Sequence, residues 1–112
     1  MGIDYDLLKG LPKNISSWPI WLGDHYSKGN LNIPAIVCIL AREFSKDLNE
    51  NFSWSGQTDA SYVNLAACFD KYNKVWIDFC NALNFGATNH FENEVCSVIP
   101  GFDRLLKRGR DN

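Results

Sequence analysis

The sequence predicts an all-α fold, an irregular bundle of four to six helices. Apolar residues recur every three or four positions in several stretches, which is the period of one helix face. No segment combines strand alternation with a hairpin turn. With 112 residues, of which 46% are hydrophobic, the chain can bury a substantial core. We therefore expect residues 1–112 to form a single helical domain.

The N-terminal third is the least regular part of the sequence. Residues 4–11 are expected to add one helical turn that ends at Gly10. Ser16 or Ser17 can cap a short helix that follows. The positions that mark this helix are Trp18, Trp21, Leu22, His25 and Tyr26. Gly23 lies inside it and weakens it by about 1 kcal/mol relative to alanine.

A second element begins at Pro34, which suits the first turn of a helix, with Asn32 as the N-cap. Its apolar stripe consists of Ile36, Val37, Leu40, Phe44 and Leu48. A short buried strand over residues 35–41 is the alternative, because periodicity cannot separate the two over so few residues. Helical spacing continues to Leu48, and this favours a helix.

The clearest element is a helix over residues 59–84, with Thr58 or Asp59 as the N-cap and Gly86 as the stop. Its core face is strongly aromatic and consists of Tyr62, Leu65, Phe69, Tyr72, Trp76, Phe79 (or Cys80) and Leu83. A break into two helices near residues 70–73 is the alternative. We expect this element to be the spine of the core.

Residues 89–108 again carry apolar side chains at helical spacing. Pro100 and Gly101 interrupt the pattern, which predicts two short helices with a break near Ile99. Asn89 followed by Glu92 resembles a capping box at the start of the first of them.

Composition limits the classes of function. The net charge of −2, from 11 basic and 13 acidic residues, lacks the basic excess of a protein built to hold phosphates. The N-terminus has no signal-peptide pattern, and the longest uncharged apolar run, residues 33–41, is about half the length of a membrane span. We therefore expect a cytoplasmic protein with no membrane contact, and its four cysteines as free thiols.

Neither a metal site nor a catalytic site is predicted. Cys80, His90 and Cys96 fall within one stretch, but the tight ligand pairs of structural zinc sites are absent. Cys96 or Cys80 with His90 also supplies the ingredients of thiol catalysis, as do many chains of this size. We expect no enzyme, no cofactor and no bound metal.

Protein binding is the function that remains, and aromatic residues are its candidates. Trp54, together with Phe52, lies in a polar loop over residues 49–57, where the core does not require a tryptophan. Tryptophan is enriched at interface hot spots because it buries a large, rigid area. Trp18 and Trp21 are second-rank contacts, since both also fit as seals of a small core.

Residues 104–112 form a basic C-terminal tail whose cations are Arg104, Lys107, Arg108 and Arg110. These cations can contact a partner or a few phosphates. They also complement the dipole at the end of a helix.

These features suggest a small accessory protein that binds and inhibits a partner protein or complex. Immunity proteins, antitoxins and phage-encoded blockers of bacterial defence, including anti-CRISPR proteins, are examples of this role. The alternative is a DNA- or RNA-associated helical regulator that uses the basic tail. A homodimer stays open, because the aromatic face of residues 59–84 could also pack on a second copy.

Overall fold

The all-α prediction is confirmed by a computed structural model, which describes residues 5–111 and contains no strand within them. In chain order the elements are α1 (Tyr5–Leu8), a 3-10 turn η1 (Ile15–Ser17), α2 (Trp18–Ser27), α3 (Ile33–Asn51), α4 (Asp59–Ala82), α5 (His90–Val98) and α6 (Phe102–Asp111). No helix within this described part is both long and apolar enough to cross a membrane.

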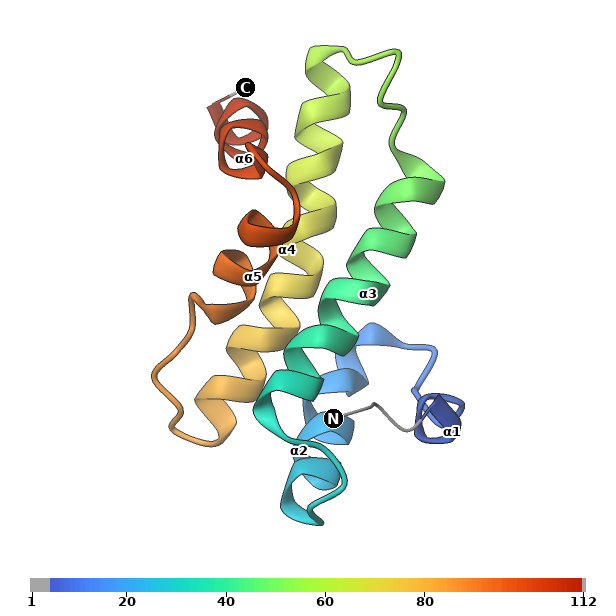
Figure 1. The fold of residues 1–112 in the computed structure, drawn as a ribbon, viewed down its shortest axis with the longest axis vertical. Helices are drawn as coiled ribbons and strands as arrows, with labels where there is room; N and C mark the ends of the chain where they lie inside the picture. Colours follow the sequence, from blue (N-terminus) through green and yellow to red (C-terminus); the bar gives the residue numbers. More distant parts are fainter. Residues whose placement is uncertain (1–4, 112) are drawn as a thin grey trace.

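The bundle is elongated, with extents of 44 × 28 × 26 Å, and its long axis follows α3 and α4 (Figure 1). These two helices are antiparallel and are joined by a loop at one end of the molecule. The short N-terminal elements α1 and α2 lie at the opposite end. The remaining helices, α5 and α6, lie on one side of this pair, where α5 packs on both α3 and α4 and α6 packs mainly on α4.

Local signals placed two helix starts correctly. The side chain of Asn32 accepts a hydrogen bond from the backbone N–H of Ala35 at 2.9 Å, so α3 begins as predicted, and a strand over residues 35–41 is excluded. At the start of α4, Thr58 and Ser61 form a reciprocal capping box. The helix then runs without a break through residues 70–73.

Other end signals were wrong. The side chain of Asn89 caps nothing, so the capping box expected with Glu92 does not form. Neither does Ser17 cap α2 with its side chain. The cap lies earlier, at Asn14, whose side chain accepts from the N–H of Ser16 and starts η1. α4 ends before Gly86, where Asn84 takes a left-handed backbone conformation with φ of 54°.

Four phenylalanines from four helices meet in the core. Phe44 of α3 lies 5.7 Å from Phe69 of α4 and 5.6 Å from Phe102 of α6, measured between ring centroids. Phe91 of α5 stacks on Phe69 at 5.4 Å. All four side chains are fully buried, so α5 and α6 belong to the same core as the long helices.

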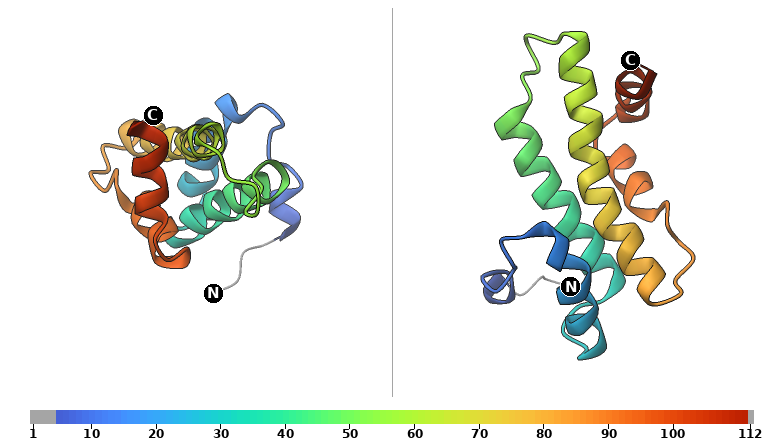
Figure 2. Two further views of the ribbon diagram at one scale, coloured as in Figure 1. Left: turned by 90° about the horizontal axis from the view of Figure 1, so that it is seen from above. Right: turned by 180° about the vertical axis from the view of Figure 1, so that it is seen from behind.

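The basic segment expected as a tail forms most of α6, which crosses α4 steeply (Figure 2). Phe102, Leu106 and Gly109 are the buried positions of this helix. A Cβ atom on Gly109 would overlap the backbone carbonyl of Tyr62 and lie 2.9 Å from the Cβ of Ala66. Glycine therefore allows the two helix backbones to touch, and α6 is fixed in place along its whole length.

Candidate protein-interaction surface

The loop between α3 and α4 presents Trp54 to solvent on an ordered support. Phe52 ends α3 by donating its backbone N–H to the carbonyl of Leu48 at 2.8 Å. From that anchor the chain projects Trp54, whose side chain is 46% exposed. The indole N–H of Trp54 makes no hydrogen bond to any residue between 5 and 111. Both an apolar ring and a free donor are thus available to a partner.

Phe52 packs against Trp54 and is itself buried. Its side chain is buried, with 8% exposed, because it fills the gap between the end of α3 and the start of α4. The Phe52 ring lies edge-on to Trp54 at 4.7 Å and 6.3 Å from Tyr62. This burial gives Phe52 a supporting role, and its contact with a partner stays a prediction.

Gln57 fastens the same loop to α4. Its side-chain amide donates to the backbone carbonyl of Trp54, and its carbonyl oxygen accepts from the hydroxyl of Tyr62 at 3.3 Å. Neither Gln57 nor Tyr62 was predicted to belong to a site. Tyr62 shares the aromatic face of α4 with the core, so periodicity alone assigned it there.

Arg108 extends this cluster onto α6. Its guanidinium carbon lies 4.2 Å from the centroid of the Tyr62 ring, in cation–π geometry. We call the set Phe52, Trp54, Tyr62 and Arg108 the aromatic end. It brings Phe52 and Trp54 of the loop together with Arg108 of α6 through Tyr62, which the sequence placed in the core.

The two arginines at the end of α6 are used differently. Arg110 donates to Asp70 at 3.0 Å and lies 3.7 Å from Glu92, so it ties α6 to α4 and α5. The hydrogen bond with Asp70 raises the pKa of the Arg110 guanidinium. Arg108 lies 3.5 Å from Asp59, a longer separation than a charge-assisted hydrogen bond, and makes no hydrogen bond within the described chain.

Arg104 and Lys107 lie on the outward side of α6. Both are exposed, and Arg104 neighbours Lys107 and Arg108 on the helix surface, because it precedes them by three and four residues. Neither makes an ion pair with any residue in the described range. These two cations are therefore available to bind external anions.

Trp18 and Trp21 lie on α2, away from the aromatic end. Trp18 is 6% exposed, its indole N–H donates to the carbonyl of Pro12 at 2.7 Å, and its ring lies 5.8 Å from Tyr72. The core thus uses both the ring and the donor of Trp18, and its contact with a partner stays a prediction.

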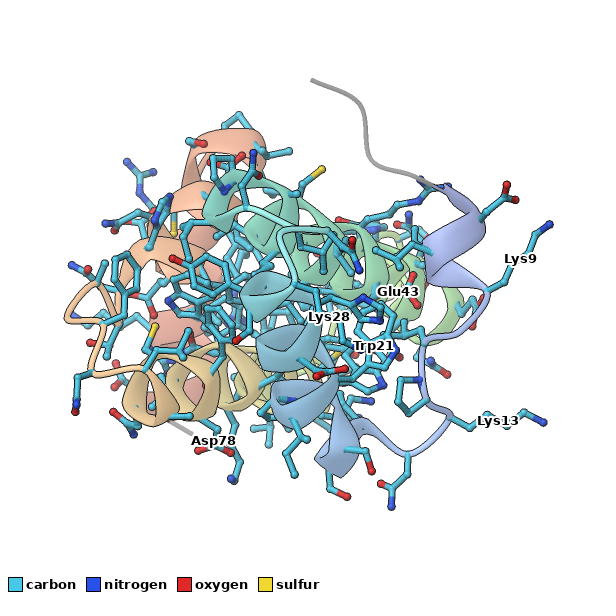
Figure 3. All side chains as sticks on the ribbon, turned by 90° about the horizontal axis from the view of Figure 1, so that it is seen from below. Lys9, Lys13, Trp21, Lys28, Glu43 and Asp78 are labelled. Atoms are coloured by element: carbon cyan, nitrogen blue, oxygen red, sulfur yellow. The ribbon has the colours of Figure 1, made fainter. Side chains whose placement is uncertain are left out.

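Trp21 is partly buried. Its ring lies edge-on to His25 at 4.5 Å, and its indole nitrogen is 4.0 Å from the position of a Cβ on Gly10. Figure 3 shows Trp21 between α2 and the segment that follows α1. It seals that segment against the bundle, in agreement with the alternative role considered for it.

Three of the cysteines, Cys68, Cys80 and Cys96, lack the environment of reactive thiols. Burial raises the pKa of the thiols of Cys80 and Cys96, and it raises that of Cys68 to about 11. A cysteine nucleophile instead requires a thiolate, which forms when neighbouring charges lower the pKa. His90 packs edge-on against Trp76, with ring centroids 5.8 Å apart. No cluster of three metal-binding side chains occurs among the described residues.

Comparison with known proteins adds no relative. No protein-family model matches the sequence, and no curated protein or solved structure matches it significantly.

Proposed function

We propose that this protein acts by binding another protein through the aromatic end, and that it inhibits the partner by occupying its surface. The observation that supports this most is Trp54, a half-exposed tryptophan on a loop fixed by Phe52 and Gln57. A large side chain held in place before binding loses little conformational entropy when a partner covers it. Such residues are typical binding hot spots.

An inhibitor of this kind needs no catalytic activity. The raised pKa values of the Cys80 and Cys96 thiols agree with a non-catalytic role. Within this class we propose the roles of an immunity protein, an antitoxin, or a phage-encoded blocker of a bacterial defence complex. These roles share one requirement, a small rigid domain whose exposed side chains match one protein surface.

The test compares two variants that each remove one exposed apolar side chain. Trp54→Ala removes the proposed hot spot, and Ile20→Ala removes a side chain that is 79% exposed on α2. Tagged wild-type and variant proteins are incubated with lysate of the source cells at low and high salt. Retained proteins are identified by mass spectrometry, and retained nucleic acid is measured separately.

We expect wild-type protein and Ile20→Ala to retain the same partner protein at high salt. Trp54→Ala should weaken that binding about 30-fold, which corresponds to about 2 kcal/mol. Its free energy of unfolding should change by no more than about 1 kcal/mol, because the Trp54 ring is half-exposed and packs edge-on against Phe52. Equal retention by Trp54→Ala would contradict the proposal. Retention of nucleic acid alone, released by salt, would instead favour the DNA- or RNA-associated alternative.

A further inference from the structure

The outward face of α6 carries two cations, Arg104 and Lys107, that form no ion pair with any described residue. Arg108 lies on the same face. The whole chain has a net charge of −2, and Arg104, Lys107 and Arg108 form a basic area that projects from one side of α6. Such an area attracts acidic partners and repels basic ones.

Arg108 is positioned to bind a carboxylate. The five N–H donors of a guanidinium point outward in its own plane, whereas an aromatic ring stacks on its face. Tyr62 occupies that face at 4.2 Å and leaves the donor edge accessible. Asp59, at 3.5 Å, makes no hydrogen bond with it. The stack thus holds the guanidinium in place while its donors make no hydrogen bond within the described chain, and a partner carboxylate can accept two parallel hydrogen bonds from them in competition with Asp59.

Arg110, in the same helix, is paired with carboxylates of the protein itself. It donates to Asp70 at 3.0 Å and approaches Glu92 at 3.7 Å. Its pairing attaches α6 to α4 and α5, whereas Arg108 contacts α4 through the Tyr62 ring and makes no hydrogen bond within the described chain. The longer separation between Arg108 and Asp59 therefore indicates that Arg108 can bind a ligand outside the chain.

The shape of the basic area favours a protein over a nucleic acid. Arg104 and Arg108 are four residues apart, so their backbones are separated by about 6 Å along the helix axis. Asp59, Asp103 and Asp111 surround this short stretch, and all three are exposed. A continuous polyphosphate would extend beyond the three cations and meet these carboxylates. Two or three carboxylates on a peptide need to contact only the cations.

From these contacts we infer that the partner presents an acidic segment with a neighbouring apolar or aromatic side chain. The carboxylates bind Arg104, Lys107 and Arg108, and the apolar side chain packs on Trp54. The distances across the aromatic end make this arrangement continuous, since the chain of contacts Arg108, Tyr62, Phe52 and Trp54 has no gap larger than 6.3 Å. The inference rests on the proposed function and adds the chemistry of the partner.

The test uses an array of short synthetic peptides as the probe. The peptides carry acidic, neutral or basic side chains around one leucine or tryptophan, and a fluorescent single-stranded oligonucleotide is measured in parallel. One variant combines Arg104→Ala with Lys107→Ala. The matched control combines Lys9→Ala with Lys13→Ala, which removes the same charge from two side chains that extend into solvent near α1 (Figure 3). Circular dichroism establishes that both variants stay folded.

We expect wild-type protein to prefer acidic peptides with an apolar anchor by about tenfold or more over neutral ones. The Arg104→Ala/Lys107→Ala variant should lose most of that preference, and the control should keep it. Trp54→Ala should reduce binding of every peptide that has the anchor.

Three results would overturn the inference. They are equal binding of acidic and neutral peptides, no peptide binding, and tighter binding of the oligonucleotide that depends on Arg104 and Lys107. If the lysate partner depends on Trp54 but not on these two cations, protein binding stands and only the acidic segment is withdrawn.

Discussion

Two tryptophans, Trp18 and Trp54, show how the two ends of this molecule differ. At the α2 end, Trp18 is 6% exposed and donates its indole N–H to Pro12. At the loop end, Trp54 is 46% exposed and its indole N–H finds no partner in the described structure. Each ring packs on another aromatic ring, Trp18 on Tyr72 and Trp54 on Phe52. Folding therefore occupies the ring and the N–H donor of Trp18. Trp54 is held in place by Phe52, but its ring and its donor remain accessible to a partner.

The largest effect we expect is on stability, from Trp18→Ala. Removing a buried tryptophan and its hydrogen bond should lower the free energy of unfolding by about 3–5 kcal/mol. Trp54→Ala should lower it by no more than about 1 kcal/mol. Urea denaturation of both variants, followed by circular dichroism, measures the difference. Decreases of similar size would mean that the loop end is as much a part of the core as the α2 end.

The second effect concerns Gly109, which lets α6 approach α4. Gly109→Ala places a methyl group against the carbonyl of Tyr62, so α6 must move. We expect the free energy of unfolding to fall by about 1–3 kcal/mol, despite the higher helix propensity of alanine. The stack of Arg108 on Tyr62 should loosen, and this should change the near-ultraviolet circular dichroism.

Gly23→Ala is the matched control for that substitution. Gly23 also lies in a helix, and a Cβ there would have no neighbour within 4 Å. We expect this variant to be more stable by up to about 1 kcal/mol. A loss of stability in both variants would contradict the close packing of α6 on α4.

The sequence predicts the parts of this fold that depend on neighbouring residues. Asn32 and Thr58 cap helices as predicted because each cap bonds to a residue three positions along the chain. Pro100 and Gly101 separate α5 from α6 through local backbone restrictions. Helical spacing likewise identified the core face of α4, except for Leu83, which follows the last residue of the helix and is exposed.

Features that depend on contacts between helices could not be predicted. Gly109 looked like part of a tail, since only the crossing of α6 over α4 gives it a role. Tyr62 fits the core pattern by spacing, and its contact with Arg108 requires that same crossing. Trp54 is exposed and Phe52 is buried, although the two residues are only two positions apart. Composition suggested an aromatic contact there without saying which ring would face solvent.

Between the two ends, Asp47 of α3 fixes the spacing of the long helices. One of its carboxylate oxygens accepts hydrogen bonds from Lys71 at 2.7 Å and from the hydroxyl of Tyr72 at 2.8 Å. The other accepts from Asn51 at 2.8 Å, close to the start of the loop. Because the Tyr72 ring packs on Trp18, this carboxylate connects the α2 end with the loop end.

The smallest effect we expect is a dependence of stability on pH through Asp47. The hydrogen bond from Lys71, aided by those from Tyr72 and Asn51, lowers the pKa of this carboxyl below its unfolded value of about 3.9. Its contribution is therefore complete above about pH 4 and is lost as the pH falls through the lower, folded pKa. Asp47→Asn should lower the free energy of unfolding by about 1 kcal/mol at neutral pH, and the difference from wild type should shrink under acid conditions.

Asp78→Asn, which removes an exposed ion pair with Lys74 inside α4, is the control. It should lower the free energy of unfolding by less than about 0.5 kcal/mol at neutral pH. Urea denaturation across the acid range measures both, and an unchanged difference between wild type and Asp47→Asn at low pH would show that Asp47 acts by its shape and not by its charge.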